Sequence, residues 1–270
     1  MTLRDTHERA LPFHTAQTAE DYLVYLKHVA LYEFVKPNCA GKRVLDLGCG
    51  EGYGVAALAS VARWVVAADY SFDAVMHACQ KYARANAVFV VCDAQHLPFA
   101  NDCFDTAISF EVIEHIPDVP RYLQEIKRIG VAHGQAIIST PNRLLRLLPF
   151  QKPWNRFHLR EYDAPGLART IGAVFSQVQI LGITAIPAIL EIEKQRVKQN
   201  PFVAYPKMLA QMLLPSGVYD RLKRVKPNTD TPAVQSTIPP MPNNFTASDY
   251  AISSNGLRES INLIAVGKFE

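Results

Sequence analysis

One stretch of the sequence limits the choice of fold more than any other: a short apolar run that leads directly into a glycine-rich turn. It begins at Arg43, and glycine then occupies every second position from Gly48 to Gly54. The run is rich in β-forming residues, and helix-forming residues follow the turn. Glycine adopts positive φ without strain and lets backbone N–H groups approach a ligand. The stretch therefore predicts a strand, a tight turn and a helix, with a ligand at the start of the helix.

The rest of the chain repeats this alternation of short apolar runs and amphipathic segments. Further runs typical of buried strands lie at residues 64–69, 88–92, 104–110, 135–142, 176–181 and 261–269. Helices are expected between them, including one that Ser71 caps, and a helix at residues 19–35 that ends before Pro37. Apolar strands separated by helices form a parallel sheet covered on both faces. The sequence thus predicts an α/β fold with a doubly wound, mostly parallel, seven-stranded Rossmann-like sheet.

The alternation stops after the sixth predicted strand. We expect an N-terminal helix and α/β core at residues 1–182, a helical and irregular insertion at residues 183–257, and a final strand at residues 258–270 that returns to the core sheet. The insertion is far longer than an ordinary connection. Its first part has helical spacing and many basic residues, and its second part is rich in proline. We interpret it as a lid over a ligand, as a surface for peripheral membrane contact, or as an amphipathic helix packed on the core.

Charge and cysteine content narrow the class of protein. The formal net charge is +3, from 28 Lys and Arg against 25 Asp and Glu, so the charge balance indicates neither nucleic acid nor membrane as a partner. The five cysteines show no C-x-x-C spacing, which predicts free thiols in a reducing compartment and no zinc site. The first residues lack a continuous apolar segment, and no run reaches the roughly 18 apolar residues that span a bilayer. We expect a cytoplasmic protein.

Three acids stand near the ends of the first three predicted strands. Asp46 precedes the glycine turn, Asp69 ends the second strand and Asp93 follows the third. Carboxylates accept hydrogen bonds, so the first suits a cationic amino group, the second a ribose diol and the third an exocyclic amine such as that of adenine. A dinucleotide fingerprint would instead need glycine where Tyr53 stands. Together the acids predict a nucleoside with an amino-acid tail as the ligand.

These motifs resemble those of the class I S-adenosylmethionine-dependent methyltransferases, in particular the small-molecule branch that includes quinone-biosynthesis enzymes. Residues 44–54 are similar to the first motif of that family, and Asp69, Asp93 and residues 139–142 fall where its later motifs belong. The resemblance covers about residues 40–182 and the final strand. It implies that S-adenosylmethionine is the cofactor. The cofactor-binding residues that we expect are Asp46, Gly48, Cys49, Gly50, Glu51, Gly52, Asp69, Tyr70, Asp93, Ala94 and Glu111.

A second motif, Glu111-x-x-Glu114-His115, follows the fourth predicted strand. We expect His115 and His158 to be the catalytic residues, because an imidazole titrates near neutral pH and can act as general base for a hydroxyl. The motif resembles one in quinone-biosynthesis and small-RNA methyltransferases, where two acids and two histidines can hold a divalent metal. We assign no metal ligands, but the resemblance leaves open a divalent metal at Glu111, Glu114, His115 and His158.

The resulting hypothesis is an enzyme of class EC 2.1.1.- that methylates a small molecule at oxygen. One alternative is a metal-assisted RNA 2'-O-methyltransferase. Another is a catalytically inactive cofactor-binding or membrane-adaptor domain that uses the basic insertion as its working surface. The N-terminal half shows no broad basic surface with stacking aromatics, which argues against a nucleic-acid acceptor. No motif in the sequence indicates the oligomeric state.

Overall fold

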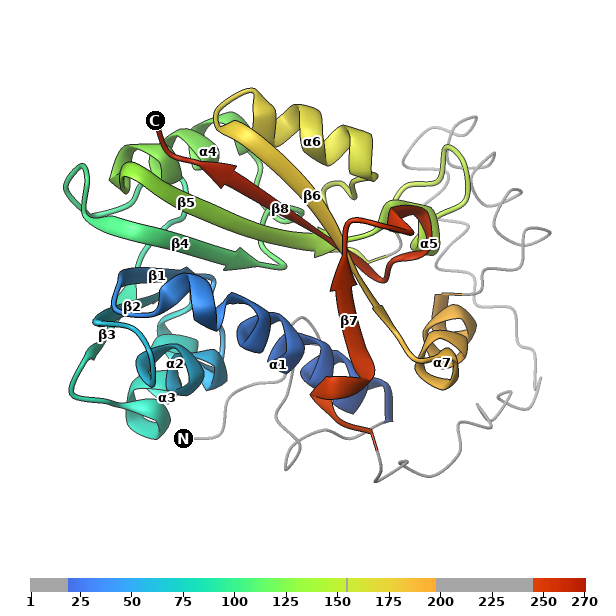
Figure 1. Ribbon diagram of the computed structural model, residues 1–270, viewed down its shortest axis with the longest axis horizontal. Helices are drawn as coiled ribbons and strands as arrows, with labels where there is room; N and C mark the ends of the chain where they lie inside the picture. The colour runs from blue at the N-terminus through green and yellow to red at the C-terminus, as the bar shows by residue number, and fades with distance from the viewer. Residues whose placement is uncertain (1–18, 154, 198–244) are drawn as a thin grey trace, which may run out of the picture.

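A single mixed sheet with helices on both faces forms the centre of the molecule (Figure 1). The computed structural model describes residues 19–153, 155–197 and 245–270. The strands are β1 (Arg43–Leu47), β2 (Trp64–Asp69), β3 (Ala87–Val91), β4 (Phe104–Phe110), β5 (Gly130–Pro141), β6 (Ser176–Ala185), β7 (Tyr250–Ser253) and β8 (Asn262–Lys268).

The order of the strands fixes where a ligand can bind. Across the sheet the order is β3-β2-β1-β4-β5-β8-β6-β7. Neighbours from β3 to β5 are parallel, whereas β8 is antiparallel to β5 and β6, and β7 is antiparallel to β6. The chain thus winds outward from β1 to β3 and returns to β4 on the other side of β1. This reversal opens a crevice at the carboxyl ends of β1 and β4, where ligands of such folds bind.

Two hydrophobic clusters, one on each face, hold the helices against the sheet. The helices are α1 (Ala19–Cys39), α2 (Tyr53–Ala59), α3 (Phe72–Tyr82), α4 (Val119–Ile129), α5 (Arg143–Arg146), α6 (Ala164–Gly172) and α7 (Pro187–Val197), with short 3-10 turns η1 (Ala247–Asp249) and η2 (Leu257–Glu259). Side chains alternate along β1, so Leu45 and Leu47 join Ile126 of α4 in one cluster while Val44 joins Leu31 of α1 in the other. In Figure 1, α4 and α6 lie on the opposite side of the sheet from α1 and α2.

The helix ends show where local sequence rules hold and where packing overrides them. Ser71 caps α3 as predicted, because its hydroxyl accepts a hydrogen bond from the N–H of Ala74 at 3.3 Å. The prediction that α1 ends before Pro37 is wrong, since the helix continues to Cys39. Val35 and Cys39 are both fully buried. Their packing outweighs the backbone hydrogen bond that proline cannot donate.

The predicted α/β Rossmann-like class is confirmed, and the seven predicted strands are all present. An eighth strand, β7, lies within the predicted insertion and pairs with β6 at the edge of the sheet. The division into core, insertion and final strand stays a prediction. Most of the basic part of the insertion and its proline-rich part, residues 198–244, lie outside the described residues.

All five cysteines are free thiols, as predicted. Among the helices that the structure describes, none is both long and apolar enough to cross a lipid bilayer.

Candidate active site

The glycine-rich turn after β1 is held by hydrogen bonds to the end of β2. The N–H of Gly48 donates to the carbonyl of Ala68 at 2.7 Å, and the N–H of Gly50 donates to Oδ2 of Asp69 at 2.9 Å. Gly48 has a φ of +84°, and a Cβ at this position would lie 2.2 Å from Cγ2 of Val112. Only glycine combines this conformation with so close an approach. The predicted strand, tight turn and helix are therefore confirmed.

A cavity of about 640 Å³ lies where β1, β2, β3 and β4 end. Its volume is typical of a site for a small molecule. Most of the predicted site residues line it, namely Gly48, Cys49, Gly50, Glu51, Asp69, Tyr70, Asp93, Ala94, Glu111 and His115. Asp46, Gly52 and His158 lie outside this lining.

The acids that follow β2 and β3 are both fixed by backbone N–H groups. Asp69 accepts hydrogen bonds from Gly50 through Oδ2 and from the N–H of Ser71 through Oδ1 at 2.8 Å. Oδ1 of Asp93 accepts a hydrogen bond from the N–H of Gln95 at 2.8 Å, and this bond is the main reason that the pKa of Asp93 is below its ordinary value. Each carboxylate oxygen has two acceptor positions. Both acids therefore keep capacity to accept hydrogen bonds from a ligand.

Asp46 lies outside the lining of the cavity. It is buried, and both of its carboxylate oxygens lie 3.2 Å from the hydroxyl of Tyr32. Burial raises the pKa of Asp46 to about 7, although the hydrogen bond from Tyr32 acts in the opposite direction. Tyr32 itself lines the cavity. The expected contact of Asp46 with a cationic amino group stays a prediction, and Tyr32 is a lining residue that Asp46 contacts.

Glu111 points toward a buried cluster of protein partners. Its φ is +56°, which is uncommon for a residue other than glycine. Nζ of Lys27 lies 3.4 Å from Oε2, and Oε1 accepts hydrogen bonds from the Ser139 hydroxyl at 3.1 Å and from the Asn262 amide. Burial opposes ionisation of Glu111, but the charge of Lys27 and these hydrogen bonds hold its pKa at about 2. Glu111 is therefore ionised, and its carboxylate is committed to α1, β5 and β8.

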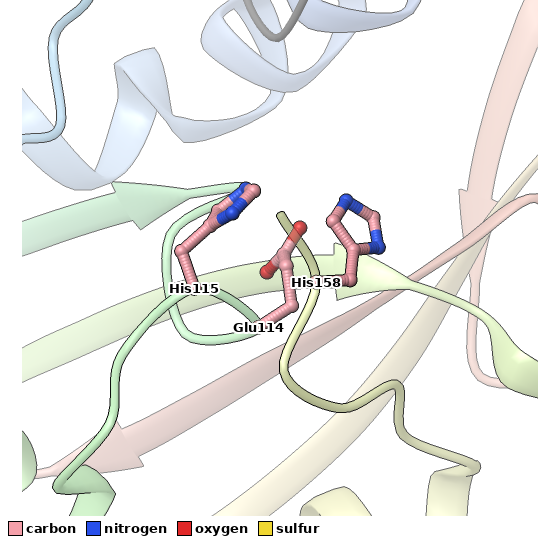
Figure 2. Close-up of side chains that lie close together, drawn as sticks. All are labelled: Glu114, His115 and His158. Atoms are coloured by element: carbon pink, nitrogen blue, oxygen red, sulfur yellow. The ribbon is translucent and has the colours of Figure 1, made fainter. Parts of the chain in front are cut away.

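Three of the four residues considered as metal ligands converge beyond the end of β4. Ligand atoms of Glu114, His115 and His158 all lie within 4.8 Å of one another (Figure 2). Nδ1 of His115 lies 3.1 Å from the carbonyl oxygen of Phe157, and Nδ1 of His158 lies 2.8 Å from Oε1 of Glu161. These contacts set the orientation of both imidazole rings. Glu111 does not join the group because its side chain is paired with Lys27, so the four-residue set is corrected to three.

Glu114 has an incomplete set of hydrogen bonds. It is fully buried, and Oε2 accepts a hydrogen bond from the Thr140 hydroxyl at 3.0 Å. In the described part of the chain no donor reaches Oε1. Burial and then the charge of Glu111 raise the pKa of Glu114 well above its ordinary value. A buried oxygen without a partner, next to two imidazoles, fits either a proton or a divalent cation.

Sequence reasoning missed the residues that surround these acids from distant parts of the chain. Lys27 of α1 and Asn262 of β8 both contact Glu111, and Phe157 lines the cavity beside His115. One signal for Lys27 was present, because it lies four residues after the buried Leu23 and therefore falls on the apolar face of α1. No comparable signal marks Asn262 or Phe157.

The sheet order, the glycine turn and the acids at the strand ends together define a class I S-adenosylmethionine-dependent methyltransferase. A family model described as a methyltransferase domain matches residues 45–138. A probable S-adenosylmethionine-dependent methyltransferase of Mycobacterium tuberculosis is 34% identical over 189 residues, which cover 70% of this chain and 67% of the relative. The chain belongs to this family. It is a methyltransferase of class EC 2.1.1.- with S-adenosylmethionine as methyl donor, which replaces the alternative of an inactive domain.

The chain is also similar to a second curated relative and to a solved structure. A ubiquinone biosynthesis O-methyltransferase of Mesorhizobium japonicum is 30% identical over 110 residues, 40% of this chain and 44% of the relative. An S-adenosylmethionine-dependent methyltransferase of Thermotoga maritima, described as a possible histamine N-methyltransferase, has a solved structure that matches 92% of each chain with a TM-score of 0.57. At 12% sequence identity this likeness shows the fold alone.

Proposed function

We propose that this enzyme methylates a hydroxyl oxygen of a small molecule and that His115 removes the proton of that hydroxyl. The observation that carries the proposal is the hydrogen bond from Nδ1 of His115 to the carbonyl of Phe157. A carbonyl only accepts, so Nδ1 carries a proton, and in the neutral form of the ring the lone pair lies on Nε2. His115 also lines the cavity. An imidazole held in this orientation beside a bound acceptor is suited to general-base catalysis.

The remaining lining residues suit the parts of the methyl donor. S-adenosylmethionine, when bound, supplies a methyl group on a good leaving group. We assign the turn from Gly48 to Gly52 to the methionine part, Asp69 and Tyr70 to the ribose side, and Asp93 with the N–H of Ala94 to adenine. The fixed carboxylates of Asp69 and Asp93 support this assignment, because both keep capacity to accept hydrogen bonds. The chain then mainly has to align the acceptor and exclude water.

Two observations support a small acceptor that reacts through oxygen. The cavity of about 640 Å³ also has to hold the methyl donor, which favours a small second ligand. The relative from Mesorhizobium japonicum is named as an O-methyltransferase of ubiquinone biosynthesis. Neither observation identifies the compound, so the acceptor has to be found by a screen.

The test is a methyl-transfer screen with labelled S-adenosylmethionine against hydroxylated acids, quinone precursors, sugars, lipids and short RNAs. We expect transfer to a small hydroxylated compound. The variant His115→Ala should then lower kcat by about 10²- to 10⁴-fold, the usual contribution of a general base. His133→Asn is the matched control, because His133 is exposed on β5 and asparagine tolerates its φ of +66°. Retention of more than a third of wild-type kcat by His115→Ala would refute the role of His115.

A second candidate, metal-assisted transfer, is favoured by the unpartnered Oε1 of Glu114. Glu114, His115 and His158 would hold a divalent cation, which would lower the pKa of an acceptor hydroxyl. We would measure binding of Mg²⁺, Mn²⁺ and Zn²⁺ by calorimetry to the wild type and to His158→Ala, and repeat the screen with EDTA. Full activity in EDTA without cation binding would exclude this candidate and leave the metal-free proposal intact. Transfer to RNA alone would instead support the 2'-O-methyltransferase alternative.

A further inference from the structure

A buried lysine lies directly behind one wall of the cavity. Lys27 of α1 is 5% exposed, and its Nζ contacts Oε2 of Glu111 at 3.4 Å and Oδ1 of Asn262 at 2.9 Å. Asn262 is 1% exposed and donates a second hydrogen bond to Glu111. Glu111 lines the cavity, whereas Lys27 and Asn262 belong to the layer behind it. The three residues therefore form a cluster with one member at the cavity wall, and the Ser139 hydroxyl also donates to that member.

A contribution to the stability of the fold does not by itself explain why these polar residues are buried together. Removing two charges from water is costly, and apolar residues of similar volume often replace a buried ion pair without loss of stability. The cluster does, however, fix the positions of three segments of the chain relative to one another. It joins α1, the segment after β4 and the start of β8, which are far apart in the sequence. The cluster therefore ties these three segments to one another.

That geometry bears directly on the cavity. Glu111 has a φ of +56°, a backbone conformation that costs energy for any residue other than glycine. The next residue, Val112, lines the cavity and packs on Gly48, and the residue after Lys27, His28, also lines the cavity. Holding the Glu111 side chain therefore fixes two parts of the wall, one on α1 and one after β4.

We propose that Lys27 is a positioning residue for the methyl donor: together with Asn262 it holds Glu111, and thereby sets the cavity wall formed by His28, Glu111 and Val112. The cluster acts by geometry rather than by net charge, because the charges of Lys27 and Glu111 cancel. Loss of either support lets the segment after β4 leave its left-handed conformation. The cavity then fits the ligand less well, although the residues that touch the ligand are unchanged.

The test is calorimetric titration of S-adenosylhomocysteine into Lys27→Met, Asn262→Ala and the double variant, at a temperature where circular dichroism shows each to be folded. We expect each single change to weaken binding at least tenfold, the size of loss expected when a hydrogen bond to a charged group is removed. Both changes act through Glu111, so their effects should not multiply. The affinity of the double variant should be at most threefold lower than that of whichever single variant binds less tightly. The control Lys36→Met removes the exposed pair of α1 with Glu33 and should stay within twofold of wild type.

Two results would overturn the proposal. If the single variants lower the melting temperature but bind within twofold of wild type, the cluster is only structural. If the loss in the double variant equals the product of the single losses, the two residues do not act through a shared partner. Ser139→Ala serves as a milder variant should the others fail to fold, because it removes only one hydrogen bond to Glu111. It should weaken binding about threefold, as expected for a modest hydrogen bond, and unchanged binding would count against the proposal.

Discussion

Replacing Gly48 by alanine tests why the turn after β1 must contain glycine. The added Cβ faces two separate penalties. The φ of +84° belongs to the left-handed region, which costs an L-residue about 1–2 kcal/mol. The Cβ would also lie 2.2 Å from Cγ2 of Val112, so the valine or the turn has to move, and overpacking of this kind costs about 1–3 kcal/mol. We expect Gly48→Ala to lose about 2–5 kcal/mol of the free energy of unfolding.

A second glycine separates the two penalties. Gly41 has a φ of +69°, but a Cβ there would meet no atom within 4 Å. Gly41→Ala should therefore lose only the backbone part, about 1–2 kcal/mol. Urea unfolding of both variants gives the difference, and calorimetry with S-adenosylhomocysteine shows whether binding suffers only for Gly48→Ala. Equal losses of stability in the two variants, with binding unchanged in both, would refute the argument from the close contact with Val112.

Two further predictions concern buried polar groups. Because the pKa of Asp46 is raised to about 7 from 3.8, the folded state holds a proton that the unfolded state releases, so this stability is present at low pH and is lost as the pH rises to about 7. The unfolding free energy of Asp46→Asn relative to wild type should therefore rise between about pH 4 and 7, by at most about 1.4 kcal/mol per pH unit, and level off above pH 7. A difference that stays constant over this range in urea unfolding would contradict this. Asn142 is fully buried and donates hydrogen bonds to the carbonyls of Leu257 and Ser260 at 2.9 and 2.8 Å. Asn142→Ala should therefore lower the free energy of unfolding, measured in urea, by about 2–4 kcal/mol. A loss below about 0.5 kcal/mol would show that water replaces these bonds.

Local patterns were sufficient to predict most of the fold and the part of the site that follows the strand ends. The glycine turn, the cap at Ser71 and the acids Asp69 and Asp93 each depend on a few neighbouring residues, so the sequence determines them directly. Strand β7 was missed because it is only four residues long and is defined by its pairing with β6. A pattern that short is not distinguishable from a loop.

The arrangement around Glu111 was not predictable in this way. The resemblance of the Glu111-x-x-Glu114-His115 motif to a metal-binding segment left open that all three side chains join one cluster. The left-handed backbone at Glu111 instead sends its side chain to Lys27 and Asn262, which are 84 and 151 positions away in the sequence. Such contacts depend on the packing of the whole domain. The same applies to Asp46, whose place behind Tyr32 follows from how α1 packs on the sheet.

The central claim is that the cavity at the carboxyl ends of β1 to β4 binds the methyl donor through the acids at the strand ends. Calorimetric titration of S-adenosylhomocysteine into wild type and Asp69→Ala tests it most directly. We expect one binding site in the wild type and an affinity about 10- to 100-fold lower in Asp69→Ala, the loss expected for hydrogen bonds to a charged group. Binding of equal strength to both proteins would contradict it.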